Sequence, residues 1–264
     1  MSGKVFLFTG AGNNFVVLDG RQGGMDAFRQ VSRITELCRQ YATDGLMILG
    51  LDPEVDFSME FYNPDGSGGM MCGNGGRCIV AFANQLGVIP DYGETVFRAP
   101  DGIHKAQILF HEEHLWTVKL KMIDVQGVEP VKKGYFLNTG TRHYVQFVPD
   151  VDAMDMERQA KPLRWDPAFQ PEGTNVNFVQ VAADGLHVRT FEKGVEGETL
   201  ACGTGITASA IAAYVMDGAD RPAAGYRLQC RRGDWLQVDF HPCPDNSFTE
   251  VYLTGPAELV KICE

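Results

Sequence analysis

One short motif occurs twice in this 264-residue chain, and its two copies lie 130 residues apart. The motif is Cys-Gly-x-Gly, and it begins at Cys72 and at Cys202, where 202 − 72 = 130. Thr9-Gly10 and Thr139-Gly140 have the same separation, since 139 − 9 = 130. Short matches of this kind arise by chance, but a shared separation does not, so we predict a duplicated domain.

Each copy of the motif precedes a stretch whose apolar residues have helical spacing, at 77–86 and at 206–216. Gly87 and Gly218 follow these stretches, where a helix commonly ends on glycine. The rest of the chain contains short runs that predict strands. These runs are 15–18, 56–62, 94–98, 105–110, 115–122, 144–148, 186–191, 227–230, 235–240 and 250–253. We therefore predict an α+β fold of two similar lobes that meet near residues 123–131, each mostly antiparallel strand with one main helix.

Charge and cysteine content exclude several classes of protein. With 23 basic and 34 acidic residues, the net charge of −11 disfavours a nucleic-acid surface and leaves a small molecule as the expected partner. The early apolar run 5–8 is too short for a signal peptide or a membrane span, so we expect a cytoplasmic protein without membrane contact. Seven cysteines without a Cys-x-x-Cys pair argue against a disulfide framework and against a zinc ribbon.

The segment His111-Glu112-Glu113-His114 superficially resembles a zinc-binding helix. Its histidines lie three rather than four residues apart, and alternation of apolar and polar residues resumes at Leu115. We therefore expect a hairpin turn here and no metal site. The cysteines outside the repeated motif are expected to be inert: Cys38, Cys78, Cys230, Cys243 and Cys263.

A cysteine in the first turn of a helix has a particular chemistry. The backbone N–H groups there lack partners within the helix and the helix dipole is positive, so the thiolate is favoured. The glycines leave neighbouring amides uncovered, and such a turn can bind a carboxylate. Inverting a carbon next to a carboxylate needs a base on one face and an acid on the other, which two such thiols would supply.

Two other interpretations use only part of this pattern. Gly203-x-Gly205-x-x-Ala208 matches a relaxed dinucleotide fingerprint, but no clear βαβ unit surrounds it. A cysteine hydrolase could pair Cys72 or Cys202 with His143, because the two side chains need to meet only in space. The hydrolase would leave the second Cys-Gly-x-Gly motif unexplained.

The chain resembles the diaminopimelate epimerases, which invert an amino-acid centre with two cysteines and without pyridoxal phosphate. The matching segments are 12–16, 63–67, 71–78, 174–176, 191–194, 197–205 and 255–257. The resemblance implies two lobes, each a strand-rich barrel around a central helix, that close over the substrate. The N-terminal lobe would comprise residues 1–122, completed by 254–264, and the C-terminal lobe would comprise 123–253.

The resemblance also implies roles for individual residues. Cys72 and Cys202 would be the paired acid and base. His143 and Glu192 would tune a thiol or support the acid–base chemistry, and Glu192 would also contact the substrate ammonium. Asparagine side chains suit the amino and carboxylate groups of a substrate, because an amide offers both donors and an acceptor. The implied substrate contacts are Asn13, Asn63, Gly73, Asn74, Asn175, Glu192, Lys193, Gly203 and Thr204.

Four departures from the family pattern concern the substrate rather than the reaction. The usual Glu-Arg pair is Glu192-Lys193, which keeps the charge but loses the bidentate fork. The usual Gly-Asn-Pro-His turn reads Gly140-Thr141-Arg142-His143, so an amide is missing and Arg142 is a hypothetical replacement contact for the carboxylate. Asn14 replaces an aspartate, and the segment before Asp44 is shorter than usual.

We therefore predict a cofactor-independent isomerase that interconverts LL- and meso-diaminopimelate through two thiols and supplies lysine and peptidoglycan precursors. The resemblance implies no cofactor and no metal, and the sequence leaves a homodimer open. One alternative is a racemase or epimerase of another amino acid with the same two-cysteine chemistry. A non-catalytic amino-acid-binding protein and the cysteine hydrolase are the others.

Overall fold

The structure, a computed structural model, describes residues 4–69, 72–218 and 225–263. Met71, which begins one of the family-like segments, lies outside the described residues. The chain divides into two compact units, Met1–Leu120 with Thr254–Glu264 and Lys121–Leu253. The first unit therefore combines the two ends of the chain.

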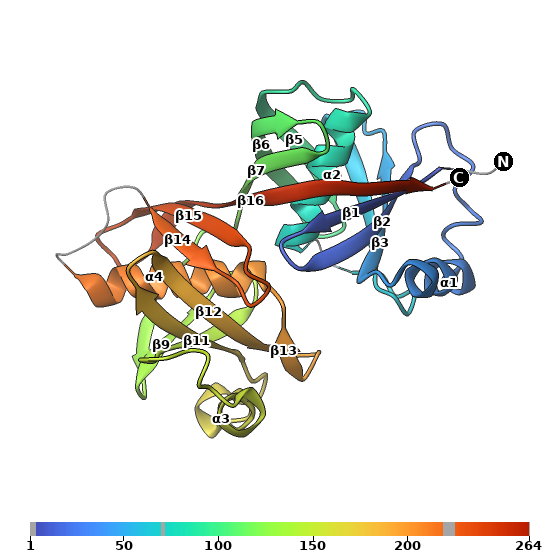
Figure 1. Cartoon of the computed structure of the whole chain (residues 1–264). Coiled ribbons are helices and arrows are strands. Elements are labelled where there is room, and N and C mark those ends of the chain that lie inside the picture. Colours follow the sequence, from blue (N-terminus) through green and yellow to red (C-terminus); the bar gives the residue numbers. More distant parts are fainter. Residues whose placement is uncertain (1–3, 70–71, 219–224, 264) are drawn as a thin grey trace. The chain divides into compact units, whose positions relative to one another are not determined.

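The first unit is a closed barrel of eight strands (Figure 1). These are β1 (Val5–Gly10), β2 (Asn13–Asp19), β3 (Gly45–Gly50), β4 (Phe57–Tyr62), β5 (Gly93–Ala99), β6 (Gly102–Glu112), β7 (Leu115–Lys121) and the last part of β16 (Phe248–Cys263). β16 pairs with both β7 and β1, and this closes the barrel. The β2–β3 and β4–β5 pairs are parallel, and the other pairs in this barrel are antiparallel.

The helix α2 (Gly73–Gln85) is the core of this barrel, and its residues from Gly73 to Asn84 are all buried. A helix that is covered all round consists mostly of small or apolar residues, and α2 supplies Gly, Ala, Ile, Val and Phe. Its buried polar residues Asn74, Arg77 and Asn84 are all hydrogen-bonded. The barrel wall approaches the helix closely, because a Cβ at Gly10 would lie 2.8 Å from the sulfur of Cys78. Gly87 follows the helix with a φ of +68°, as the sequence predicts.

The second unit repeats this order of elements. Its strands are β8 (Glu129–Val131), β9 (Gly134–Asn138), β10 (Arg142–Phe147), β11 (Asn175–Ala182), β12 (Gly185–Glu192), β14 (Tyr226–Gln229), β15 (Trp235–Pro242) and the first part of β16, while β13 (Gly197–Thr199) pairs beside β12. A bridge between Val125 and Phe248 links the segment before β8 to β16. The parallel pairs β10–β11 and β12–β14 occupy the places that β2–β3 and β4–β5 occupy in the first unit.

The helix α4 (Gly203–Asp217) is the core helix of the second unit, and its residues from Gly205 to Ala213 are buried. Gly218 ends it with a φ of +58°. Each unit therefore has a central helix within a mostly antiparallel set of strands. The predicted α+β fold of two similar lobes is confirmed.

Each unit also contains a second helix that the sequence analysis does not predict. α1 (Val31–Tyr41) buries Ile34, Leu37 and Cys38 against β2 and β3, but its N-cap residue, Gln30, makes no side-chain cap. α3 (Met156–Arg164) contains Pro162, which normally signals the end of a helix, and a short 3-10 turn, η1 (Pro167–Phe169), follows it. Both helices pack on the outside of their barrels (Figure 1).

The repeat is not uniform along the chain. In the parallel pair β2–β3 Phe15 lies opposite Gly45, a separation of 45 − 15 = 30. In the parallel pair β10–β11 His143 lies opposite Asn175, a separation of 175 − 143 = 32. The connection between the paired strands is therefore two residues longer in the second unit, so the separation of 130 does not hold through both strands.

The segment at 111–114 is the predicted hairpin turn. Glu112, at the end of β6, pairs with Leu115 at the start of β7, and Glu113 has a φ of +51° in the turn. The ring of His111 stacks on Trp116 with 4.5 Å between the centroids. His111 therefore packs as an aromatic side chain.

Candidate active site

Cys72 is the N-cap residue of α2. Its backbone is extended, with φ −95° and ψ 149°, and its Sγ accepts a hydrogen bond from the backbone N–H of Gly75 over 3.2 Å. A hydrogen bond from an amide stabilises a thiolate more than a thiol, and the helix dipole acts in the same direction. The predicted placement of this cysteine at the start of a helix is confirmed.

A cluster of polar side chains, Asn13, Asn74 and Arg77, stabilises the turn that begins at Cys72. The side chain of Asn74 donates to Oδ1 of Asn13 over 2.7 Å and accepts from Arg77 over 2.8 Å. Arg77 is fully buried and also donates to the backbone carbonyls of Gly73 and Pro256, each over 3.2 Å. These contacts fix the start of α2 to β2 and to β16.

Asn63 lies in the turn that follows β4. Its backbone N–H and its side-chain Nδ2 donate to the backbone carbonyl and the hydroxyl of Ser67, over 2.9 and 3.0 Å. In the same unit, Asn13 reaches the cysteine turn through Asn74, whereas the polar contacts described for Asn63 stay within its own turn. Asn63 is half-buried, which leaves part of its surface accessible.

Cys202 is the N-cap residue of α4, as predicted, and it is buried. Its Sγ lies 3.4 Å from the hydroxyl oxygen of Thr204. The backbone carbonyl of Thr204 in turn accepts from the hydroxyl of Thr139 over 2.9 Å, which ties the first turn of α4 to the end of β9. The two cysteines therefore share a place at a helix start but differ in their described partners, an amide for Cys72 and a hydroxyl for Cys202.

His143 lies behind this turn, on β10, and is completely buried. Its Nε2 is 3.0 Å from the hydroxyl of Thr204 and 2.9 Å from that of Thr141, and its Nδ1 is 3.0 Å from Nδ2 of Asn177. Burial lowers the pKa of His143 to about 3. The imidazole is therefore neutral at physiological pH.

Asn175 and the end of β12 lie beside this histidine. The side chain of Asn175 donates to the backbone carbonyl of Arg142 over 3.0 Å and accepts from the backbone N–H of Lys193 over 2.7 Å. Burial raises the pKa of the neighbouring Glu192. Cys202, His143, Asn175, Glu192 and Lys193 thus belong to one end of the second unit.

Arg142 does not share the inward face of β10 with His143. Successive side chains of a strand point to opposite faces, and the guanidinium of Arg142 lies 3.0 Å from the carboxylate of Glu172 and over the ring of Phe136. This position does not support the hypothesis that Arg142 replaces a missing carboxylate contact. Thr141, from the same altered turn, contacts His143 instead.

Sequence comparisons match this chain along nearly its full length. The family model described as diaminopimelate epimerase matches residues 5–125 and 135–260. A diaminopimelate epimerase from Flavobacterium psychrophilum is 38% identical over 97% of this chain and 98% of its own length. The chain belongs to the diaminopimelate epimerase family. Two further relatives bear the same name. The one from Chlorobaculum tepidum is 35% identical over 96% of this chain and 97% of its own length, and the one from Aquifex aeolicus is 38% identical over 93% and 91%.

Solved structures show the fold of this family member independently. A phenazine biosynthesis protein of the PhzF family from Bacillus anthracis superposes with a TM-score of 0.74 over 100% of this chain and 99% of its own, at 13% identity. A hydroxyproline epimerase from Agrobacterium vitis, solved with bound trans-4-hydroxy-L-proline, gives 0.64 over 99% and 91%, at 15% identity. At these identities the likeness concerns the fold alone.

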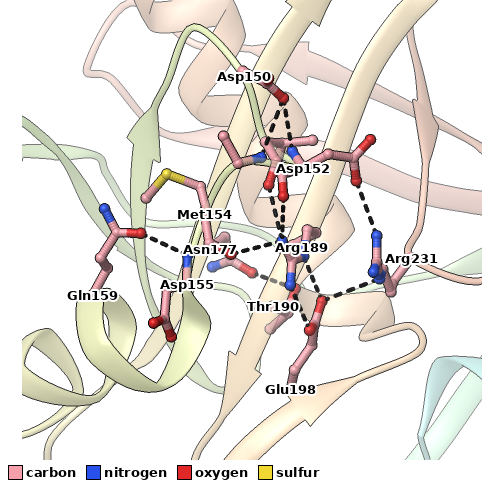
Figure 2. A network of polar contacts seen from close by, with 12 residues as sticks. Asp150, Asp152, Met154, Asp155, Gln159, Asn177, Arg189, Thr190, Glu198 and Arg231 are labelled. Carbon is pink, nitrogen blue, oxygen red and sulfur yellow. Dashed lines mark hydrogen bonds and ion pairs between the residues drawn. The ribbon is translucent and has the colours of Figure 1, made fainter.

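A polar network holds the strand that leads to Cys202 in this epimerase-family chain (Figure 2). The guanidinium of Arg189, on β12, makes two hydrogen bonds to Glu198 of β13, over 2.6 and 2.7 Å. It also donates to the backbone carbonyls of Val151 and Met154, which precede α3. Because β13 ends three residues before Cys202, this network fixes the approach of the chain to the cysteine turn.

Several residues of the site were not identified from the sequence. Asn177 and Thr190 are buried on the inward faces of β11 and β12, and the hydroxyl of Thr190 donates to Oδ1 of Asn177 over 2.9 Å. Asn177 lies two residues after Asn175, so strand alternation was a signal that could have found it. Arg77 stood inside the first cysteine segment, but nothing in the sequence showed that it would be buried.

Two further properties concern only the residues that the structure describes. Within 4–69, 72–218 and 225–263, no group of three or more His, Cys, Asp or Glu side chains is arranged to hold a metal ion. Over the same residues, no helix has both the length and the apolar character that crossing a membrane requires.

Proposed function

We propose that this chain is an epimerase that interconverts LL- and meso-diaminopimelate without a cofactor, with Cys72 and Cys202 as its two acid–base groups. The observation that carries the proposal is that each unit starts its central helix on a cysteine within the same Cys-Gly-x-Gly turn. Relatives that bear the name diaminopimelate epimerase and match nearly the whole chain support the choice of substrate.

The reaction breaks the C–H bond at a carbon next to a carboxylate. A thiolate on one face takes the proton, and the electron pair of the broken bond moves toward the carboxylate. The thiol on the opposite face then gives its own proton to the same carbon, which inverts the centre. The two sulfurs exchange their protonation states, so the reverse reaction uses the same groups in opposite roles.

Stabilisation of the developing charge is the larger part of this catalysis. A helix dipole lowers the pKa of a thiol by roughly one unit, whereas one preorganised hydrogen-bond donor is worth about 3 to 4 kcal/mol in a transition state. The amides at the starts of α2 and α4 are free of intrahelical partners by the geometry of a helix. We assign the carboxylate of the reacting centre to the amides of Gly73, Asn74, Gly203 and Thr204.

The remaining contacts recognise the rest of the substrate. We assign the amino and carboxylate groups to the amide side chains of Asn13, Asn63 and Asn175, and the ammonium to Glu192. For the distal carboxylate we assign Lys193, which is exposed, rather than Arg142, which is already paired with Glu172. A lysine gives a point charge rather than a fork, so this contact constrains the distal group less than an arginine would.

The proposed chemistry requires reduced cysteines. The seven cysteines all lie in the described residues, and none of them forms a disulfide there. A reducing cytoplasm maintains cysteines in this state, and we assign the enzyme to that compartment.

The test is an assay on purified, reduced protein with LL-diaminopimelate, followed by chromatographic separation of the stereoisomers. EDTA and hydroxylamine are present to remove metal ions and to trap any carbonyl cofactor. We expect meso-diaminopimelate to form at the same rate with and without these reagents, and L-proline and L-glutamate to remain unchanged. Absence of the meso isomer would overturn the proposal, and inversion of the other amino acids would replace it with a broader racemase.

A further inference from the structure

Three oxygen and nitrogen atoms form a closed triangle next to Cys202. Nε2 of His143, the hydroxyl of Thr141 and the hydroxyl of Thr204 are separated by 2.9, 3.0 and 3.1 Å. Thr204 is the member of this triangle that also reaches the cysteine sulfur, over 3.4 Å. Any effect of His143 on Cys202 through hydrogen bonds therefore has a route through the hydroxyl of Thr204.

The orientation of Asn177 fixes the direction of the hydrogen bonds. Its Nδ2 lies 3.2 Å from the backbone carbonyl of Tyr144, which can only accept, while its Oδ1 accepts from Thr190. The second hydrogen of Nδ2 then points at Nδ1 of His143. Nδ1 must be the acceptor, so the neutral imidazole carries its hydrogen on Nε2 and donates to the threonine pair.

The side chain of Asn175 also lies near Nε2 of His143, and this contact does not prevent Nε2 from donating to the threonines. Nδ2 of Asn175 lies 3.5 Å from Nε2, which is long for a hydrogen bond, and it lies 3.0 Å from the backbone carbonyl of Arg142. The amide of Asn175 therefore donates to that carbonyl and leaves the hydrogen on Nε2 undisturbed.

We infer that Thr204 is a positioning residue that donates its hydroxyl hydrogen to the thiolate of Cys202, and that neutral His143 and Thr141 orient this hydroxyl by donating to it. The hydroxyl accepts from the triangle and directs its own hydrogen at the sulfur. A hydrogen bond to an ionised acceptor is stronger than one to a neutral acceptor, so this arrangement favours the thiolate. The inference rests on the proposed function only in giving Cys202 an acid–base role.

Two titratable groups lie on the inward faces of β10, β11 and β12, the strands beside the Cys202 turn. His143 on β10 is neutral, and β11 contributes the amides of Asn175 and Asn177. On β12, alternation places Glu192 on the same face as Thr190, while Arg189 lies on the other face, paired with Glu198. Since a change at Thr204 leaves Glu192 and His143 in place, a comparison of variants isolates the hydroxyl.

The test measures the thiol directly and requires no substrate, so its outcome is independent of whether diaminopimelate is turned over. Wild type and Thr204→Val are alkylated with iodoacetamide between pH 5 and pH 9, and the labelling rate of the Cys202 peptide is followed by mass spectrometry. Valine keeps the shape of threonine and removes the hydroxyl. We expect the apparent pKa of Cys202 to rise by about one unit, with roughly tenfold slower labelling at neutral pH.

Thr204→Ser, which keeps the hydroxyl, is expected to reproduce the wild-type profile, and Thr141→Val to shift it in the same direction by less. Cys230 is buried in the same unit and reports on folding, because it stays unlabelled while the unit is intact. A Thr204→Val profile that superposes on wild type would overturn the inference, as would a serine variant that behaves like the valine variant. If Thr204→Val exposes Cys230, an unchanged Thr141→Val profile overturns it instead.

Discussion

Nδ2 of Asn177 donates a hydrogen bond to Nδ1 of His143 over 3.0 Å, and both side chains are completely buried. An amide nitrogen at this position cannot accept a proton from the ring. The contact therefore selects the tautomer of His143 with its hydrogen on Nε2, and burial keeps the ring uncharged.

Replacing this amide with a carboxylate should reverse the tautomer preference of His143. In Asn177→Asp the new side chain accepts from Nδ1–H and attracts positive charge, so the pKa of His143 should rise by at least two units. The ring nitrogen shifts in a pH-titrated NMR spectrum report both tautomer and charge. Asn246→Asp, in the same unit but bonded to Val128, is the control and should leave these signals unchanged. A wild-type His143 that titrates at its ordinary pKa of 6.5 would contradict the assignment.

The lowered pKa of His143 also makes stability depend on pH. The folded protein does not protonate this ring until the pH falls to about 3, while the unfolded chain protonates it near 6.5. Between these values the unfolded state binds more protons, so stability falls as the pH falls. Between pH 7.5 and pH 5, protonation linked to His143 lowers the free energy of unfolding by about 2 kcal/mol.

His143→Gln cannot take up this proton, and its free energy of unfolding should fall less over the same range. Denaturant titrations of both proteins at the two pH values measure the difference. Parallel pH dependences of wild type and variant would show that His143 is not held neutral in the folded state.

Arg77 should contribute strongly to the stability of the first unit. It is fully buried and donates to Asn74 and to the carbonyls of Gly73 and Pro256. Lysine lacks the planar fork, so Arg77→Lys should leave at least one buried acceptor unpaired and lower the free energy of unfolding by about 3 kcal/mol.

The matched control is Arg33→Lys, at an exposed pair with Glu36, which should change the stability by less than about 0.5 kcal/mol. Chemical denaturation of the two variants measures both effects. Equal unfolding midpoints for Arg77→Lys and wild type would show that the buried contacts add little.

Lys193 and Arg142 should differ in their effect on the substrate. Removing the exposed charge in Lys193→Ala should raise the KM for diaminopimelate by about tenfold, with a smaller change in kcat, because the distal carboxylate is remote from the reacting carbon. Arg142→Ala breaks a pair with Glu172 and should leave KM within about twofold of wild type. Steady-state kinetics on both variants decide the assignment, and the opposite ranking would restore Arg142 as the carboxylate contact.

The elements that the sequence identified are those with a local signal. The repeated Cys-Gly-x-Gly turns, the apolar stretches after them and the glycines at 87 and 218 predicted α2 and α4. Helices with conflicting local signals were missed, such as α1 without a side-chain cap and α3 with Pro162 inside it. β16 was predicted only at 250–253, because Gly255-Pro256 interrupts a strand that pairing with β7 and β1 continues to Cys263.

The site shows the same division between local and distant information. Each cysteine could be placed at a helix start from its own segment. The partners of His143 could not, because Thr141, Asn177 and Thr204 come together only through the pairing of β10 with β11 and the packing of α4 against both. The hypothesis about Arg142 failed to gain support for a related reason, since the face of β10 on which it lies depends on the register of the barrel.

The central claim is that each unit supplies one thiol to the same carbon. The direct measurement is the exchange of the α-proton of LL-diaminopimelate in heavy water, followed by NMR together with the appearance of the meso isomer. In wild type and in the control Cys243→Ala, the inverted carbon should carry deuterium. In Cys72→Ala and Cys202→Ala, inversion should slow by at least about 100-fold. Inversion at the wild-type rate in either of these two variants would contradict the account.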